Sequence, residues 1–239
     1  MTTLWSEPES MEYHLKQWRE TKESTKKFIG FLDGKVMPNK NYLDLGCGAG
    51  AATFALSKRF SDSNWTGIDI DPKLTAIAKS LSAEAHASKL NFSVGDLQQY
   101  QAKNMFDGVV SLQTLSWLDD FKYAFRNVFE NIRPNWFAIT SLFFKGNISS
   151  YTKIQEHETD RVLSYNTYSI PLVKVEAEKY NYSLTKYEPF EIDIDLPKPI
   201  NLNSMTTYTL RLSENEEKSR LQISGPILMN WYMLLFEQI

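Results

Sequence analysis

The chain has 239 residues, a length that suits one large domain or one domain with additions. Hydrophobic residues make up 42% of the chain and charged residues 23%, which allows a sizeable core and excludes a disordered chain. The formal net charge of -3 argues against a dedicated nucleic-acid binder. The single cysteine, Cys47, excludes a disulfide framework and any zinc site built from several cysteines.

No apolar stretch reaches the roughly 18 to 20 residues that a membrane-spanning helix needs. The best candidates, 137–144 and 227–236, are too short. Residues 1–20 lack the basic start and apolar run of a secretory signal, so we expect a cytoplasmic protein without a membrane partner. The three histidines show no metal-ligand spacing, and we expect no metal site.

Short apolar runs alternate with helical patterns up to about residue 146. The runs predict strands at 42–45, 65–70, 90–94, 106–112 and 136–144. The helical patterns fall at 21–33, 51–59, 72–87 and 121–132. Strands separated by helices require crossover connections, which predicts an α/β fold with a parallel sheet covered on both faces.

The pattern changes after residue 146 to alternating polar and aromatic residues. Two β-hairpins are predicted, at 148–157 with 162–170, turning at 158–160, and at 207–212 with 220–224. A helix at 171–180 and a long strand at 183–196 lie between them. The nearly continuous apolar run 227–236 predicts a final strand buried on both faces.

The strongest chemical signal is the segment Asp44-Leu45-Gly46-Cys47-Gly48-Ala49-Gly50 between a strand and a helix. Glycines permit a tight turn and let a ligand approach the backbone closely. The helix N-terminus that follows offers free N–H groups and partial positive charge, which suits a carboxylate or a phosphate. Asp44 is placed either to accept hydrogen bonds from an amino group or to fix the loop. An ordinary turn with glycines for packing is the alternative.

Two further acids follow the next strands. Asp69 ends the second strand, and neighbouring strand ends meet at one sheet edge, where a carboxylate can bind ribose hydroxyls. Asp71, before Pro72, is more typical of a helix N-cap. The Gly95-Asp96-Leu97 segment follows the third strand and suits the amine and ring of adenine, with an ordinary turn as the alternative.

Two nucleotide-binding interpretations compete at this loop. The pattern Gly46-x-Gly48-x-x-Ala51 with Asp69 also fits the loose dinucleotide fingerprint. That fingerprint asks for neither an acid at Asp44 nor a Gly-Asp pair after the third strand, and both are present.

Together these motifs resemble the class I S-adenosylmethionine (SAM) dependent methyltransferases, in their small-molecule, methyltransferase-domain branch. The resemblance covers about 40–145 and rests on YLDLGCGAG (42–50), GIDIDP (67–72), GDLQQY (95–100) and FDGVVSLQTLSWLDD (106–120). It implies SAM as cofactor and S-adenosyl-L-homocysteine as product.

The resemblance implies cofactor contacts at both ends of SAM. Around the methionine part and the sulfonium it places the backbone of Gly46, Cys47 and Gly48 and the strand end Ser111, Leu112 and Gln113. Around the adenosine it places Asp69 on the ribose, Ile70 on the adenine face, Asp96 on the amine and Leu97 on a ring nitrogen.

The resemblance also implies a doubly wound, seven-stranded Rossmann-like sheet whose last strand is antiparallel, a role that 227–236 fits, with β-hairpin additions in the C-terminal part. We expect a single methyltransferase domain over 1–239. Its expected parts are N-terminal lid helices (1–35), the SAM-binding core (36–145), substrate-covering additions (146–226) and the final strand (227–239).

Related methyltransferases use a segment like 13–19 as a lid over the cofactor. Tyr13 and Trp18 would shield the sulfonium and Arg19 would pair with the methionine carboxylate, unless the segment is a surface helix. Candidates for the substrate pocket are the aromatic residues Trp117, Tyr151, Tyr165 and Tyr168, with a core tryptophan and an exposed sheet face as alternatives. The sequence identifies no catalytic residue, and His14 is the one candidate base.

The fourth strand ends in Ser111-Leu112-Gln113-Thr114 and lacks the Asn/Asp-Pro-Pro-aromatic motif of DNA base-amino methyltransferases. We therefore expect methyl transfer from SAM to a small molecule by in-line displacement, with nucleic acid disfavoured. The alternatives are a non-catalytic protein of this fold that binds a partner and, less favoured, an NAD(P)-dependent oxidoreductase. The acceptor atom and the oligomeric state stay open.

Overall fold

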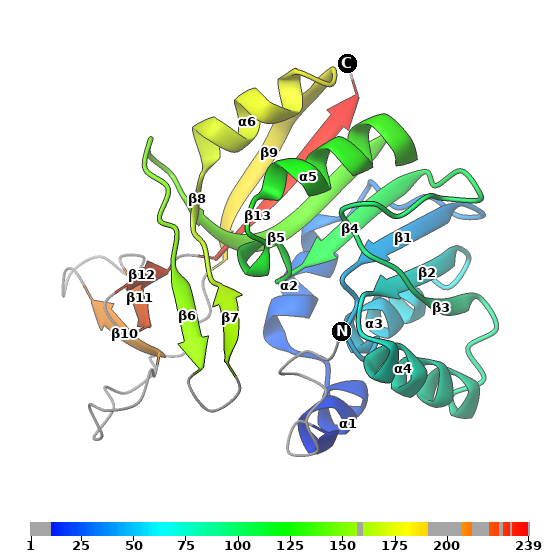
Figure 1. The fold of residues 1–239 in the computed structure, drawn as a ribbon. Coiled ribbons are helices and arrows are strands. Elements are labelled where there is room, and N and C mark those ends of the chain that lie inside the picture. The colour runs from blue at the N-terminus through cyan, green and yellow to red at the C-terminus, as the bar shows by residue number, and fades with distance from the viewer. Residues whose placement is uncertain are drawn as a thin grey trace.

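A computed structural model describes residues 11–156, 160–190, 207–211, 220–224, 227–229 and 231–238. Its main sheet has the strand order β3-β2-β1-β4-β5-β13-β9, with a short strand β8 beside β5 (Figure 1). The five parallel strands are β1 (Asn41–Leu45), β2 (Asn64–Asp69), β3 (Leu90–Val94), β4 (Gly108–Leu112) and β5 (Trp136–Phe144).

The last strand reverses direction. β13 (Trp231–Gln238) lies between β5 and β9 (Tyr182–Phe190) and is antiparallel to both. This confirms the predicted Rossmann-like sheet with an antiparallel last strand. The predicted bounds 227–236 were wrong, because the strand of this sheet begins at Trp231, and residues 227–229 form a separate strand, β12 (Ile227–Met229).

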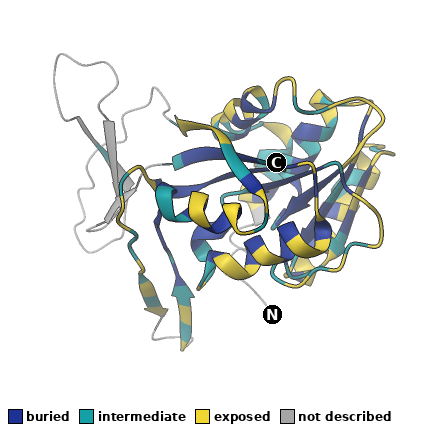
Figure 2. Cartoon of the chain, turned by 90° about the horizontal axis from the view of Figure 1, so that it is seen from above, coloured by how far each residue is buried: buried dark blue, intermediate teal, exposed yellow. Residues whose placement is uncertain are grey.

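Helices cover both faces of the sheet. The helical elements of the described residues are α1 (Met11–Arg19), α2 (Glu23–Phe31), α3 (Ala51–Arg59), α4 (Pro72–Glu84), the 3-10 turn η3 (Leu115–Trp117), α5 (Phe121–Arg126), the π-helix η4 (Asn127–Ile132) and α6 (Ile170–Glu178). In Figure 2 the central strands of the sheet are buried and lie between helices whose outer faces are exposed. Among the described residues, no helix combines the length and the apolar character needed to cross a membrane.

The alternation of side chains along each strand builds two separate cores. Leu43 and Leu45 of β1 join the cluster formed with α5, η4 and α6, whereas Tyr42 joins the cluster formed with α2, α3 and α4. Val109 and Val110 of β4 divide in the same way. Because successive side chains point to opposite faces, a strand that is apolar throughout supplies both cores.

Local signals set two helix boundaries. Asp71 caps α4, accepting hydrogen bonds from the amides of Lys73 at 2.9 Å and Leu74 at 3.5 Å, which confirms the predicted N-cap before Pro72. The helix predicted over 121–132 is instead divided into α5 and the π-helix η4, which ends at Arg133 in the left-handed conformation.

The C-terminal part carries the predicted hairpins. β6 (Lys153–Glu156) pairs antiparallel with β7 (Arg161–Ser164), and β10 (Thr207–Arg211) with β11 (Arg220–Ser224). β12 extends the second hairpin to a three-stranded sheet. The predicted turn at 158–160 lies mostly outside the described residues, as does the predicted strand beyond Phe190.

The close packing of β4 against β5 yields a stability test. A Cβ at Gly108 would lie 2.2 Å from indole atoms of Trp136, whereas a Cβ at the exposed Gly30 of α2 would meet nothing within 4 Å. We expect Gly108→Ala to lower the free energy of unfolding by about 1–3 kcal/mol through overpacking. Gly30→Ala should raise it by up to about 1 kcal/mol, because alanine favours a helix interior. Urea unfolding of both variants measures the difference, and equal stabilities would contradict this account.

Candidate functional site

The glycine loop after β1 is bonded to the end of β2. The amides of Gly46 and Cys47 both donate to the carbonyl oxygen of Ile68, at 2.8 and 2.9 Å. The amide of Gly48 donates to the carboxylate of Asp69 at 2.8 Å. The structure thus brings together the glycine turn and the acid of the next strand, which the sequence predicted to share one sheet edge.

The three glycines of this loop all have positive φ, yet they serve different ends. A Cβ at Gly46 (φ 76°) would lie 2.5 Å from the side chain of Thr114, and one at Gly50 (φ 83°) 2.5 Å from Phe92. A Cβ at Gly48 (φ 54°) would meet no atom within 4 Å. Packing therefore explains part of the motif, while Gly48 leaves open space beside the carboxylate of Asp69.

Asp44 is buried behind the loop with half of its carboxylate in use. Its Oδ2 accepts a hydrogen bond from the Thr53 hydroxyl at 2.6 Å, while its Oδ1 is buried without a hydrogen-bond partner among the described residues. Burial, with a smaller contribution from the nearby Asp69 and against the lowering effect of the Thr53 hydrogen bond, raises the pKa of Asp44 to about 7. Asp44 therefore fixes the start of α3 and retains one oxygen that a buried donor can reach.

Asp69 anchors the loop. Its two oxygens accept hydrogen bonds from the amides of Asp71 at 2.9 Å and of Gly48, and burial raises the pKa of its carboxyl group. A carboxylate has about four acceptor positions, so Asp69 retains room for a ligand hydroxyl. Sequence spacing pointed to this acid but not to its bond with Gly48. The next residue, Ile70, leaves 38% of its surface exposed at the strand end.

The segment after β3 is held by its own side chains. Asp96 accepts hydrogen bonds from the amide of Gln98 and the side chain of Gln99. The carbonyl of the buried Leu97 accepts one from Asn127 of η4 at 3.0 Å. Asn127 was missed by sequence reasoning, because nothing near it in the chain indicates a contact 30 residues away.

The end of β4 is irregular. Gln113 has φ 58°, a conformation that non-glycine residues seldom adopt, and its amide donates to the Thr140 carbonyl at 2.7 Å. The Thr114 hydroxyl donates to the carbonyl of Gly46 at 3.2 Å. Ser111 is fully buried and donates to the Leu45 carbonyl, so its side chain ties two strands together. Leu112 is half-buried next to it.

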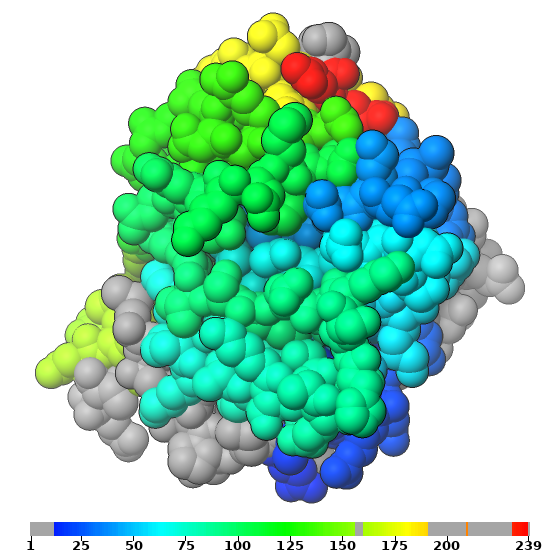
Figure 3. Space-filling view, turned by 90° about the vertical axis from the view of Figure 1, so that its right-hand side faces the viewer, coloured from blue at the N-terminus to red at the C-terminus, as the bar shows by residue number. Residues whose placement is uncertain are grey.

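The N-terminal helix α1 contacts the same region through Trp18. The Trp18 indole N–H donates to the carbonyl of Ala49 at 2.7 Å, and its ring stacks on Phe54 of α3 with 4.4 Å between centroids. In Figure 3, α1 lies at the lower end of the face that α4 and the β3 edge cover.

The other predicted residues of this segment differ in how far they are exposed. Tyr13 is exposed, and its hydroxyl accepts from Lys22 at 2.6 Å. Arg19 is exposed as well. His14 is buried, with its ring against the edge of Tyr13.

The four aromatic residues predicted to contact the substrate differ in their position and burial. Trp117 and Tyr165 are half-buried and face each other, with 4.5 Å between ring centroids. Tyr168, on β8 (Tyr168–Ser169), is fully buried in the core and its hydroxyl donates to the Leu118 carbonyl, so its expected place on a pocket roof or exposed face was wrong. Tyr151 is 61% exposed beside it.

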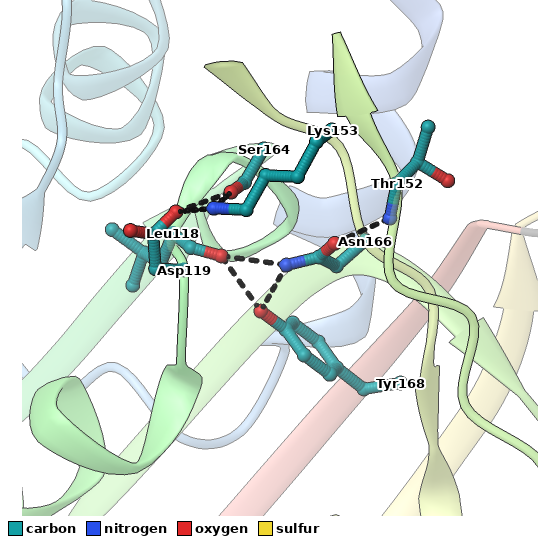
Figure 4. Close-up of polar contacts among 7 residues, drawn as sticks. All are labelled: Leu118, Asp119, Thr152, Lys153, Ser164, Asn166 and Tyr168. Carbon is teal, nitrogen blue, oxygen red and sulfur yellow. Dashed lines mark hydrogen bonds and ion pairs between the residues drawn. The ribbon is translucent and has the colours of Figure 1, made fainter. Parts of the chain in front are cut away.

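A polar joint connects the loop after β4 to the hairpin β6–β7 (Figure 4). Asp119 accepts hydrogen bonds from Lys153 and Ser164. The side chain of Asn166 donates to the carbonyl of Leu118 at 2.8 Å and to the hydroxyl of Tyr168 at 3.1 Å. This joint was missed by sequence reasoning, since a lone asparagine in a hairpin gives no signal.

The arrangement fits a ligand with an ammonium group and a diol. The buried Oδ1 of Asp44 suits the ammonium, and the carboxylate of Asp69 beside the open space at Gly48 suits the hydroxyls. Burial raises the pKa of the Cys47 thiol, which keeps it protonated. Among the described residues, no group of three His, Cys, Asp or Glu side chains could hold a metal ion.

Comparisons with known proteins agree with this geometry. Residues 43–135 match the family model described as "Methyltransferase domain". Malonyl-[acyl-carrier protein] O-methyltransferase of Bacillus anthracis is 28% identical over 124 residues, which are 51% of this chain and 45% of that protein. Ajmaline N-methyltransferase of Rauvolfia serpentina is 35% identical over 95 residues, 39% of this chain and 32% of that protein. The match with this chain thus covers less than half the length of either relative.

The fold likeness extends further along the chain. The crystal structure of magnesium protoporphyrin IX methyltransferase from Synechocystis PCC 6803 with bound SAM superposes with a TM-score of 0.58 at 12% identity. It covers 91% of this chain and 79% of that one. Residues 43–135 thus match a methyltransferase domain in sequence, and the chain shares its fold with a methyltransferase that was crystallised with SAM.

Proposed function

We propose that this protein transfers a methyl group from SAM to a small-molecule acceptor by in-line displacement. The observation that carries the proposal is the buried Oδ1 of Asp44, which has no hydrogen-bond partner among the described residues and lies behind the glycine loop of the methyltransferase domain. A buried carboxylate oxygen without a donor is costly, so a ligand ammonium group accounts for its retention.

In this proposal each part of the cofactor has its own contacts. Asp44 would accept from the ammonium group, Asp69 from the ribose hydroxyls, and Ile70 would cover the adenine face. Asp96 and the backbone of Leu97 would meet the adenine edge. The remaining contacts of this proposal are Tyr13, Trp18, Arg19, Gly46, Cys47, Gly48, Ser111, Leu112 and Gln113.

The sulfonium of SAM supplies the electrophilic methyl group. The protein's part is to align an acceptor with that methyl group and to exclude water, and positioning alone can supply on the order of 7–11 kcal/mol of the barrier. A base is required only for an acceptor protonated near neutral pH, and His14 stays the one candidate.

The ajmaline N-methyltransferase supports a small-molecule acceptor. The relatives include both O- and N-methyltransferases and so do not choose the acceptor atom. A cytoplasmic location and the division into lid (1–35), core (36–145), additions (146–226) and final strand (227–239) stay part of this proposal.

Cofactor choice is tested by calorimetric titration with S-adenosylhomocysteine, with NADH as the control. We expect micromolar binding of S-adenosylhomocysteine and none of NADH. Tight binding of NADH alone would favour an oxidoreductase, and binding of neither would favour a partner-binding protein of this fold.

The ribose contact predicts a selective loss. Wild-type protein should bind 5′-methylthioadenosine about tenfold more tightly than its 2′-deoxy analogue, because a hydrogen bond to a charged group is worth about 1.5–3 kcal/mol. Asp69→Asn should reduce that preference. The measured quantity is the ratio of the two dissociation constants, because a general disturbance of the loop would lower the affinity for both ligands equally. A ratio unchanged by the substitution would remove Asp69 from the ribose site.

The raised pKa of Asp44 leads us to expect that cofactor binding depends on pH. Its carboxyl group has a pKa of about 7 in the free protein, and an ammonium ligand prefers the ionised form. Protons therefore compete with the ligand below neutrality, and S-adenosylhomocysteine should bind about tenfold more weakly at pH 6 than at pH 8. Asp44→Asn cannot ionise, so its affinity should be low and nearly constant over this range. A wild-type affinity that does not change with pH would contradict the assignment.

A further inference from the structure

The chain that leaves β4 links the glycine loop to a pair of aromatic rings. The Thr114 hydroxyl donates to the carbonyl of Gly46, and the amide of Trp117 donates to the carbonyl of Thr114 at 3.0 Å. Trp117 therefore lies one short turn from the loop. The ring of Tyr165, which follows β7, lies against it with 4.5 Å between centroids and a 40° tilt. Two rings far apart in the sequence thus pack against each other, and we call this pair the aromatic wall.

Asn166 fixes the aromatic wall from both sides. The backbone amide of Asn166 donates to the carbonyl of Ser116 at 2.7 Å, and its side-chain amide donates to the carbonyl of Leu118 at 2.8 Å. Both neighbours of Trp117 are therefore bonded to the residue that follows Tyr165. The Asn166 side-chain oxygen accepts from the amide of Thr152 at 3.0 Å, and the residue is buried (Figure 4). Because the wall is already held in place, a ligand that binds to it loses little free energy to the ordering of side chains.

The hydroxyl of Tyr165 has no hydrogen-bond partner among the described residues, although its ring is half-buried. The neighbouring Tyr168 shows the usual situation, in which the hydroxyl both donates to Leu118 and accepts from Asn166. Burial raises the pKa of Tyr165, so its phenol is protonated at neutral pH and can donate. An unpaired phenol on a fixed aromatic surface points to a ligand that accepts a hydrogen bond.

We propose that Trp117 and Tyr165 form the acceptor-binding wall, which selects a flat, uncharged molecule bearing a hydrogen-bond-accepting oxygen or nitrogen. The rings pack on the flat body, and the Tyr165 hydroxyl donates to the accepting atom. The charged residues of the adjoining joint, Lys153 and Asp119, are bonded to each other, which favours a neutral ligand over a phosphorylated one. This inference rests on the proposed function, because it assigns the wall to the methyl acceptor.

The test uses protein saturated with S-adenosylhomocysteine and two probes, methyl 4-hydroxybenzoate and phosphoethanolamine, titrated by ligand-observed NMR. We expect wild-type protein to bind the ester and to bind phosphoethanolamine at least tenfold more weakly. Tyr165→Phe should weaken ester binding about 2- to 10-fold through loss of one hydrogen bond. Tyr187→Phe, an exposed tyrosine of β9, is the matched control and should leave ester binding unchanged. Trp117→Ala should weaken it at least tenfold.

Affinity for S-adenosylhomocysteine and the melting temperature should stay unchanged in Tyr165→Phe, which separates the role of the hydroxyl from a structural one. Failure of wild-type protein to bind S-adenosylhomocysteine would overturn the proposed function itself. If S-adenosylhomocysteine binds normally but the ester fails to bind, or binds no better than phosphoethanolamine, the result overturns the aromatic wall and leaves the proposed function intact. Ester binding that Tyr165→Phe leaves intact overturns the role of the hydroxyl, and this variant decides the matter even where Trp117→Ala fails to fold.

Discussion

The bonds between the glycine loop and the end of β2 are the constraint on which the site depends. The carbonyl of Ile68 accepts two loop amides and the carboxylate of Asp69 accepts a third, so the loop has one shape before any ligand arrives. The same contacts place Asp69 and the open space at Gly48 together. Because these three amides are satisfied by the end of β2, the position of the loop against that strand is fixed.

The additions after β5 are joined to this core by polar contacts. β8 pairs with β5, and the buried Asn166 bonds to the loop that follows β4. Buried polar groups that are fully paired fix one arrangement where apolar contacts would tolerate several. These contacts fix the position of the hairpin β6–β7 relative to the sheet that carries the glycine loop (Figure 1).

Local patterns were sufficient for most of the sheet and for the acids at its edge. The apolar runs of β1, β4 and β5 and the Asp71-Pro72 cap carry strong short-range signals, and the structure follows them. Contacts between distant segments could not be predicted, because no periodicity encodes them. The bond from Asn127 to Leu97 and the burial of Tyr168 depend on where the chain returns in space. The division of 227–236 into two strands has the same origin, since a continuous apolar run does not say which sheet each part joins.

The buried carboxyl group of Asp44 also determines how ligand binding exchanges protons with the solvent. With a pKa of about 7, this group is half protonated at neutral pH in the free protein. Capture of an ammonium group would drive it to the ionised form and release about half a proton into the buffer at pH 7. The heat measured in a titration would then contain the ionisation enthalpy of the buffer, so phosphate and Tris would report different apparent enthalpies for one and the same binding event.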